Sequence, residues 1–307
     1  MQTRRSRWGS IVLGMHHDSA GTEFDRTLRR VHGRCGAPLC VGIDPVMEKL
    51  PEPLHGSEPG AAFEAFSRNV IDAVAPSASA VKFQAACYER LGAAGVVALE
   101  AGIQHARDAG LAVILDAKRG DIGISARHYA AAATNLGAQA ITVNAYLGME
   151  SVEPYLDAGL AVFVLVRTSN PGSADVQDVP LRSGGTLAMH VGQLVAELGR
   201  SRPGVHAVVG ATQHDQSAVL RAVMPDQLFL LPGLGAQGAS VEDLCAFAIH
   251  PSHAGNDPSR GLLATASRSV IYAGQGAEWA QGVAAAAADL NAQLRSALMP
   301  SAATRAE

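Results

Sequence analysis

The sequence has few aromatic residues and no excess of basic ones. Aromatic residues make up 5% of the 307 residues, and 24 Lys+Arg against 28 Asp+Glu give a net charge of −4. A protein that binds nucleic acid without sequence preference needs a basic surface, and often aromatic side chains on which bases stack. The composition therefore predicts no nucleic-acid partner.

Cysteine is scarce, and long apolar runs are absent. The four cysteines are scattered, with no Cys-x-x-Cys pair, which disfavours a disulfide framework or a zinc site and fits the reducing cytoplasm, the location we expect. The sequence has no run of about 18 predominantly apolar residues, the length that a membrane-spanning helix needs. We therefore expect no membrane association.

Lysine is the rarest charged residue. Only Lys49, Lys82 and Lys118 occur, and the other 21 basic residues are arginines. An arginine side chain does not give up its proton in a protein, whereas a lysine can. Each lysine is therefore a candidate for chemistry that arginine could not supply.

Hydrophobic residues reach 48% and charged residues only 17%, so the chain can bury a sizeable core. Short runs rich in Val, Ile, Leu and Phe alternate with Ala-rich segments that have helical spacing. The strands predicted in this way are 39–44, 80–85, 112–118, 140–145, 161–167, 206–211, 228–232 and 262–267. The predicted helices are 60–75, 92–109, 123–136, 149–157, 184–199, 213–223, 239–248 and 277–297. Continuous apolar strands between helices indicate a parallel sheet, and eight such units favour an α/β fold with a single (β/α)8 TIM barrel over an open doubly wound sheet.

The same pattern sets the domain boundaries. We expect a single barrel over 23–298, a disordered N-terminal extension over 1–22 and a flexible tail over 299–307. The stretch 249–260 is rich in His, Pro, Gly and Asn and lies between the last two predicted strands. We interpret 236–260 as a lid and phosphate loop, because long irregular segments at such positions often close over a site.

Charged residues gather at the ends of the predicted strands, where a barrel carries its active site. Asp116 and Lys118 are two residues apart on the third strand, so both side chains point into the barrel mouth. Lys82 lies on the neighbouring strand, and Asp44 ends the first. A lone Asp-x-Lys pair is also typical of a solvated strand end. The second lysine favours a site in which alternating charges keep one another ionised.

The segment 233–238 reads Gly-x-Gly-x-x-Gly. It comes late in the chain, and no acidic residue closes a strand about 20 residues further on, so the spacing disfavours a dinucleotide site. A glycine-rich turn that binds one phosphate through backbone N–H groups is the better interpretation, with Arg268 as a bidentate partner. A structural turn without a ligand is the alternative.

Taken together, these motifs resemble orotidine 5'-phosphate decarboxylases, in particular the longer bacterial branch of that family, from Phe24 to about Leu298. The matching segments are Asp116-Ala117-Lys118-Arg119-Gly120-Asp121-Ile122, Gly42-Ile43-Asp44-Pro45, Val81-Lys82-Phe83, Asn144-Ala145-Tyr146-Leu147-Gly148, Pro232-Gly233-Leu234-Gly235-Ala236-Gln237 and Ser267-Arg268-Ser269. The resemblance implies decarboxylation of orotidine 5'-monophosphate to UMP, the last step of de novo pyrimidine biosynthesis. It also implies a homodimer and chemistry without a metal or cofactor.

The resemblance further implies a role for each matching residue. The catalytic array is Lys82, Asp116, Lys118 and Asp121, in which Lys118 stabilises and then protonates a C6 carbanion. The expected substrate-binding residues are Asp44, Ser125 and also Lys82 for the ribose, Ser169 for the pyrimidine, and Gln237 and Arg268 for the phosphate. Ile122 and Pro232 are also expected in the site. Asp121, Ile122 and Ser125 are expected to reach into the partner subunit's site. Whether Tyr272 contacts the phosphate is left open.

Three other functions compete with this interpretation. A metal-dependent keto-sugar-phosphate decarboxylase shares Asp-x-Lys-x-x-Asp but has a glutamate ligand where Lys82 stands. A Schiff-base aldolase needs a neutral lysine, whereas flanking carboxylates favour the ammonium. A non-catalytic barrel scaffold would tolerate losses in the charged array, and none is seen. His250 and His253 could bind a metal, but an exposed polar loop is the preferred interpretation.

Overall fold

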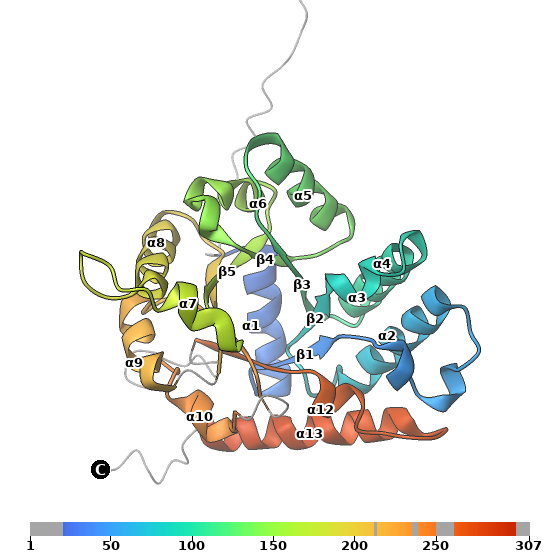
Figure 1. Cartoon of the computed structure of the whole chain (residues 1–307). Coiled ribbons are helices and arrows are strands. Elements are labelled where there is room, and N and C mark those ends of the chain that lie inside the picture. The colour runs from blue at the N-terminus through green and yellow to red at the C-terminus, as the bar shows by residue number, and fades with distance from the viewer. Residues whose placement is uncertain (1–20, 212–213, 235–238, 250–260, 299–307) are drawn as a thin grey trace, which may run out of the picture.

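Eight parallel strands close into a barrel in the computed structural model, which describes residues 21–211, 214–234, 239–249 and 261–298 (Figure 1). Each strand pairs with the next along the chain, and β8 pairs with β1. The strands are β1 (Leu39–Ile43), β2 (Ala80–Gln84), β3 (Ala112–Arg119), β4 (Ala140–Val143), β5 (Ala161–Arg167), β6 (Val205–Val209), β7 (Phe229–Pro232) and β8 (Leu262–Ala266). The predicted TIM barrel is confirmed, because apolar runs of strand length between amphipathic helices have few other ways to be buried.

Helices follow the strands and surround the barrel. The α-helices are α1 (Glu23–Cys35), α2 (Pro59–Val74), α3 (Ala85–Glu89), α4 (Ala93–Asp108), α5 (Gly123–Asn135), α6 (Glu153–Asp157), α7 (Ala174–Gln177), α8 (Leu187–Ser201), α9 (His214–Val223), α10 (Val241–Cys245), α12 (Arg268–Ile271) and α13 (Trp279–Leu298). The 3-10 helices are η1 (Met47–Lys49), η2 (Glu52–Leu54), η3 (Ala145–Leu147), η4 (Met149–Ser151) and η5 (Pro171–Ser173). None of the described helices is long and apolar enough to cross a membrane.

The two faces of each strand pack against different layers. On β1, Leu39 and Val41 belong to the core between strands and helices, whereas Cys40 faces the barrel interior. On β3, Leu115 faces the helices and Ile114 faces inward. This alternation follows from the period of two in a strand, and it directs the polar residues of the same inward series to the inside of the barrel.

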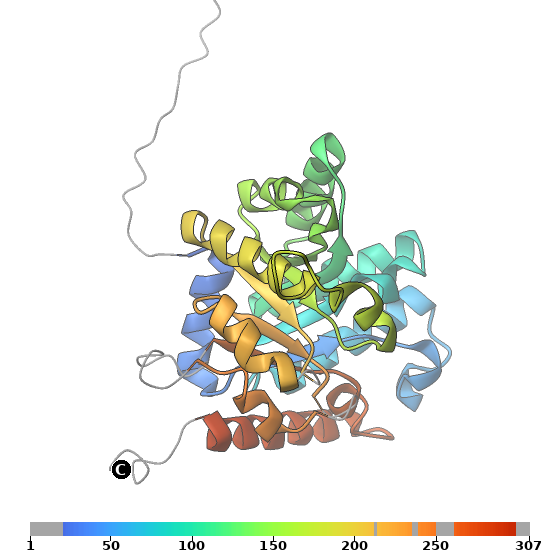
Figure 2. The ribbon, with the colours of Figure 1, turned by 60° about the vertical axis from the view of Figure 1, so that its left-hand side comes forward.

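Helix α1, which was not among the predicted helices, packs against the N-terminal ends of the strands (Figure 2). Its Phe24 and Leu28 enter the barrel interior, where the Phe24 ring meets the Phe163 ring edge to face at 5.5 Å. Small residues at the first strand positions make room for them, namely Ala80, Ala112, Ala140 and Ala161. The interior is therefore filled with apolar side chains at this end.

Polar contacts attach α1 to the barrel. Thr22 and Asp25 form a reciprocal capping box at the start of the helix, and Asp25 Oδ1 lies 2.8 Å from His206 Nε2 on β6. Burial alone would raise the pKa of Asp25, but the charge of His206 and the hydrogen bonds hold it well below its usual range. Nearly all of the expected 1–22 extension, all of the 299–307 tail and most of the 236–260 loop lie outside the described residues.

Candidate active site

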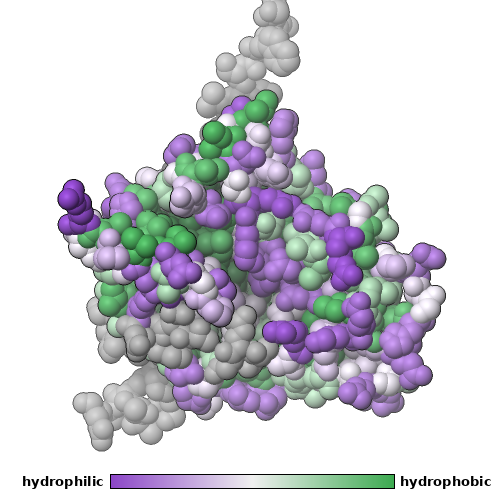
Figure 3. Space-filling model, in the orientation of Figure 1, coloured by the Kyte–Doolittle hydropathy of each residue, from purple (hydrophilic) through white to green (hydrophobic). Residues whose placement is uncertain are grey.

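A cavity of about 490 Å³ opens at the C-terminal ends of the strands, and hydrophilic residues gather around the centre of this face (Figure 3). The predicted site residues that line the cavity are Asp44, Lys82, Asp116, Lys118, Ser169, Pro232 and Arg268. They come from six different strands and the segments that follow them, so the barrel brings together residues that are far apart in the sequence.

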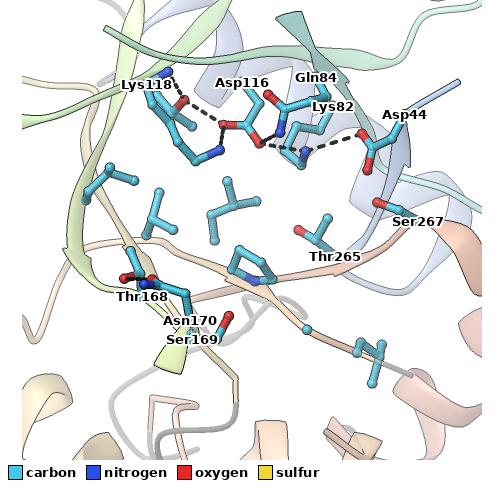
Figure 4. A pocket seen from close by; sticks show the side chains of 18 of the residues that line it. Asp44, Lys82, Gln84, Asp116, Lys118, Thr168, Ser169, Asn170, Thr265 and Ser267 are labelled. Atoms are coloured by element: carbon cyan, nitrogen blue, oxygen red, sulfur yellow. Dashed lines mark hydrogen bonds and ion pairs between the residues drawn. The ribbon is translucent and has the colours of Figure 1, made fainter. Parts of the chain in front are cut away.

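Asp116 lies at the centre of a row of charges along one wall of the cavity (Figure 4). Lys82 Nζ donates to its Oδ2 at 2.7 Å, and Lys118 Nζ donates to its Oδ1 at 2.6 Å. Each oxygen also accepts from one neutral donor: Oδ2 accepts from Gln84 Nε2 at 3.3 Å, and Oδ1 accepts from the Thr142 hydroxyl at 2.8 Å. Four donors around one carboxylate leave it little freedom to rotate.

The charges stabilise one another despite burial. The Lys82 side chain is 4% exposed, and its Nζ also lies 3.8 Å from Asp44 Oδ1. Burial would lower the pKa of Lys82, but the Asp44 and Asp116 carboxylates raise it above its usual range. Burial would likewise raise the pKa of Asp116, and Lys82 and Lys118 hold it well below its usual range. The Lys82–Asp116 pair therefore stays ionised at neutral pH.

Lys118 differs from Lys82 in its access to the cavity. Its side chain is 46% exposed, whereas that of Lys82 is nearly inaccessible. An ammonium at the cavity surface, held by one carboxylate, can meet a substrate and transfer a proton to it. Lys82 is placed instead to fix Asp116 and to balance its charge.

The segment after β5 forms the opposite side of the cavity, with Thr168, Ser169 and Asn170 (Figure 4). The Arg167 side chain is buried beneath the surface of the cavity wall, with the residue 3% exposed. Its Nη2 donates to Asp178 Oδ2 at 2.8 Å, and its Nη1 donates to the Thr168 carbonyl at 2.8 Å. A buried guanidinium with several acceptors makes a rigid support. Ser169 therefore lies on a well-braced loop.

Two glycines leave space for the serine side chains that line the cavity. A Cβ at Gly42 would lie 1.9 Å from the Ser267 hydroxyl, and one at Gly210 would lie 3.0 Å from Ser169. A side chain at Gly42 would therefore have to displace the Ser267 hydroxyl, which belongs to the lining of the cavity. These positions thus set the shape of the cavity.

On the predicted phosphate side, Pro232 and Gly233 lie beside the exposed Arg268 at the cavity edge. Gly233 has φ +120°, which suits glycine at the start of a turn. Gln237 lies outside the described residues, as do His250 and His253. No cluster of three or more metal-ligating side chains occurs in the described part of the chain.

The Tyr272 hydroxyl makes its hydrogen bonds with the backbone after β1. It accepts from the Val46 amide at 2.9 Å and donates to the Asp44 carbonyl at 3.2 Å. Tyr272 is not among the residues that line the cavity. It positions the segment after β1, which carries Asp44.

Three predicted residues lie away from the cavity of their own chain: Asp121, Ile122 and Ser125, at and after the turn that follows β3. Asp121 Oδ1 accepts from the Ile122 amide at 2.8 Å, and Ile122 is 56% exposed. Ile124, two residues further along the chain, is 62% exposed.

Sequence reasoning missed Gln84, Thr142 and Arg167. Gln84 and Thr142 share the inward-facing series of β2 and β4, so strand alternation could have found them. Nothing in the local pattern marks Arg167, because its acceptors are on the following loop and their approach depends on tertiary folding.

Comparisons with known proteins agree on one family. The family model described as "Orotidine 5'-phosphate decarboxylase / HUMPS family" matches residues 37–281. An orotidine 5'-phosphate decarboxylase of Rhodopirellula baltica is 39% identical over 85% of this chain and 95% of its own length. One from Roseiflexus castenholzii is 40% identical over 90% of this chain and 98% of its own. The solved structure of Leishmania donovani OMP decarboxylase is 32% identical, with a TM-score of 0.73, over 89% of this chain and 98% of that chain.

Proposed function

Because the chain belongs to the orotidine 5'-phosphate decarboxylase family, we propose that it is the carboxy-lyase that converts orotidine 5'-monophosphate to UMP in pyrimidine biosynthesis. The observation that carries the proposal is the Lys82–Asp116–Lys118 array at the mouth of the barrel. The proposal includes turnover without metal or cofactor, in the cytoplasm.

The proposed reaction breaks the bond between C6 of the pyrimidine and its carboxylate. The electron pair stays on C6, CO2 leaves, and a proton from Lys118 Nζ forms the new C6–H bond. The ammonium lowers the energy of the carbanion as the negative charge develops, and solvent then returns a proton to the amine. The half-exposed position of Lys118, beside an anionic partner, supports this role.

The remaining lining residues are proposed to bind the rest of the nucleotide. Asp44 would hold the ribose hydroxyls and Ser169 the pyrimidine, while Pro232, Gln237 and Arg268 would form the phosphate end of the site. A phosphate bound far from C6 can use its binding energy to close the 236–260 loop over the substrate. This loop closure belongs to the proposal.

The assay follows the absorbance change of orotidine 5'-monophosphate with purified protein, with the Lys118→Ala variant as the control. Turnover by the wild-type protein and its loss in the variant are expected. A folded wild-type protein that binds UMP but does not consume the substrate would refute the proposal.

The metal-dependent keto-sugar-phosphate decarboxylase is distinguished in the same assay. The Lys82 ammonium stands where that group needs a metal ligand, and a cation there opposes a divalent ion. Dialysis against EDTA is expected to leave turnover unchanged. Loss of turnover that Mg²⁺ restores would contradict the proposed metal-free reaction.

The proposal also includes a homodimer in which Asp121, Ile122 and Ser125 serve the partner's site. Ile122 and Ile124 are exposed, and Asp121 and Ser125 are partly exposed. Figure 3 shows hydrophobic residues on the upper part of this face of the molecule. An exposed apolar patch that carries functional side chains suits an interface related by a two-fold axis.

Mixing two inactive variants tests this shared site. In a mixed dimer of Lys118→Ala and Asp121→Ala, one site receives both lesions and the other receives neither. Random reassortment makes half of the dimers mixed, so co-refolding should restore about 25% of wild-type activity. If mixed dimers form and no activity returns, Asp121 acts within its own subunit.

A further inference from the structure

The backbone at Lys118 departs from ordinary strand geometry. Lys118 has φ +46°, and among the described residues it is the only non-glycine with positive φ. L-residues rarely adopt this conformation, because the side chain approaches the backbone, and it persists only where surrounding contacts impose it. A contact from a neighbouring element therefore holds Lys118 in this conformation.

The pairing of β3 with β4 shows where the strand is distorted. Leu115 pairs with Ile141, but the next pair joins Arg119 to Val143. Three residues of β3 thus lie opposite the single residue Thr142, and the regular ladder resumes where the Asn144 amide donates to the Arg119 carbonyl at 2.7 Å. This is a β-bulge, a feature that redirects side chains near active sites.

Thr142 replaces the backbone partner that the bulge removes. Its hydroxyl accepts from the Lys118 amide at 2.9 Å and donates to Asp116 Oδ1 at 2.8 Å. Thr142 is 1% exposed, so water does not compete for these bonds. The Thr142 hydroxyl therefore links the left-handed backbone of Lys118 to the carboxylate of Asp116.

We propose that Thr142 is a positioning residue for the decarboxylation: its hydroxyl holds the bulge that places the Lys118 ammonium and also orients Asp116. The inference rests on the proposed function, because it concerns the same site. Valine has nearly the same shape as threonine but can neither donate nor accept, so Thr142→Val removes both bonds. Thr142→Ser keeps both.

The catalytic readout is the pair kcat and KM. Thr142→Val is expected to lower kcat by about 10- to 100-fold, the effect of losing a hydrogen bond to a charged group. KM should change little, because Asp44 and Arg268 are untouched, and Thr142→Ser should recover most of kcat. The matched control is Thr27→Val, a buried threonine on α1 that is hydrogen-bonded to Gln139 at the other end of the barrel.

A second readout needs no activity. The chain has three lysines, so isotope labelling of lysine gives three backbone amide signals in an NMR spectrum. The Lys118→Arg variant identifies the signal of Lys118 by its loss. In Thr142→Val this amide should shift and exchange faster with solvent, whereas Thr142→Ser and Thr27→Val should leave it near its wild-type position.

These readouts separate the two proposals. If wild-type protein does not decarboxylate the substrate, the proposed function fails, and the Lys118 amide still reports on the structural part of the inference. An unchanged Lys118 amide in Thr142→Val, or a kcat equal to that of the wild type, would overturn the positioning role. A Thr142→Ser enzyme as slow as Thr142→Val would also overturn it, because packing of the methyl group would then be the cause.

Discussion

Replacing Asp116 by asparagine should destabilise the fold because the buried Lys82 ammonium loses its nearer counter-charge, at 2.7 Å, and keeps only Asp44 at 3.8 Å. Each carboxylate oxygen of Asp116 accepts two donors, Lys82 and Gln84 on one side, Lys118 and Thr142 on the other. An asparagine has one acceptor oxygen, so its N–H2 group must face one of these donor pairs in either orientation. The change therefore removes the negative charge and also places the N–H2 group of asparagine opposite two other hydrogen-bond donors.

The magnitude depends mainly on Lys82. Removing one partner of a buried ion pair costs about 3–5 kcal/mol, and Lys82 is only 4% exposed. The contact with Lys118 adds less, because that side chain is 46% exposed and water screens its charge. We therefore expect a loss of about 3 kcal/mol in the free energy of unfolding, the lower end of this range.

Urea unfolding followed by tryptophan fluorescence measures this loss, since Trp279 is buried in the described fold. The double variant Asp116→Asn with Lys82→Met should be more stable than the sum of the single losses predicts, by about 2 kcal/mol, because it also removes the buried ammonium that has lost its nearer counter-charge. The matched control is Glu64→Gln, which breaks a half-exposed pair with Arg68 at 2.9 Å and should cost less than about 0.5 kcal/mol. Additive losses at positions 82 and 116 would refute the reasoning.

Three further predictions concern other parts of the chain. Lys118→Arg should keep the fold but be nearly inactive, since a guanidinium does not donate its proton usefully, and near-normal turnover would contradict the proton-donor role. Arg268→Ala should turn over orotidine 5'-monophosphate poorly yet match the wild type on the phosphate-free nucleoside; equal losses on both substrates would make Arg268 structural. Phe24→Ala should lower the free energy of unfolding by about 3–5 kcal/mol through a cavity at the far end of the barrel, with KM unchanged in steady-state assays. A raised KM would show that the two ends are coupled.

The barrel could be predicted from the sequence because each strand is a short apolar run between helices. That Asp116 and Lys118 share one side of β3 followed from strand alternation, and Lys82 was expected on the neighbouring strand. At Lys118 the same rule placed the side chain correctly in the cavity, but it could not show the bulge, because the distortion depends on pairing with β4. Strand alternation could have placed Thr142 in the barrel interior, but not its bond to the Lys118 amide, which depends on which atoms meet across two strands.

Helix α1 was missed although its segment has the spacing of an amphipathic helix, with Phe24, Leu28 and Val31 at i, i+4 and i+7 and a capping box at Thr22 and Asp25. What the segment does not show is where the helix packs. Its place depends on the alanines that begin four strands, which leave space for Phe24. Arg167 is similar, because its acceptors are residues of a loop whose path no local pattern specifies.

The interior of the barrel is packed with apolar side chains at one end and open as a cavity at the other. This division explains how the charges of Asp44, Lys82, Asp116 and Lys118 are compatible with a stable fold. At the N-terminal end, alanines and the rings of α1 and β5 make an apolar layer whose burial stabilises the barrel. At the C-terminal end, Lys82 and Asp116 are desolvated, which costs stability unless each charge keeps its partner. Because the strands run through both layers, the apolar layer fixes their positions and thereby the spacing of the charges above it. The preorganisation that the proposed carbanion chemistry needs is thus supplied largely by residues that never meet the substrate.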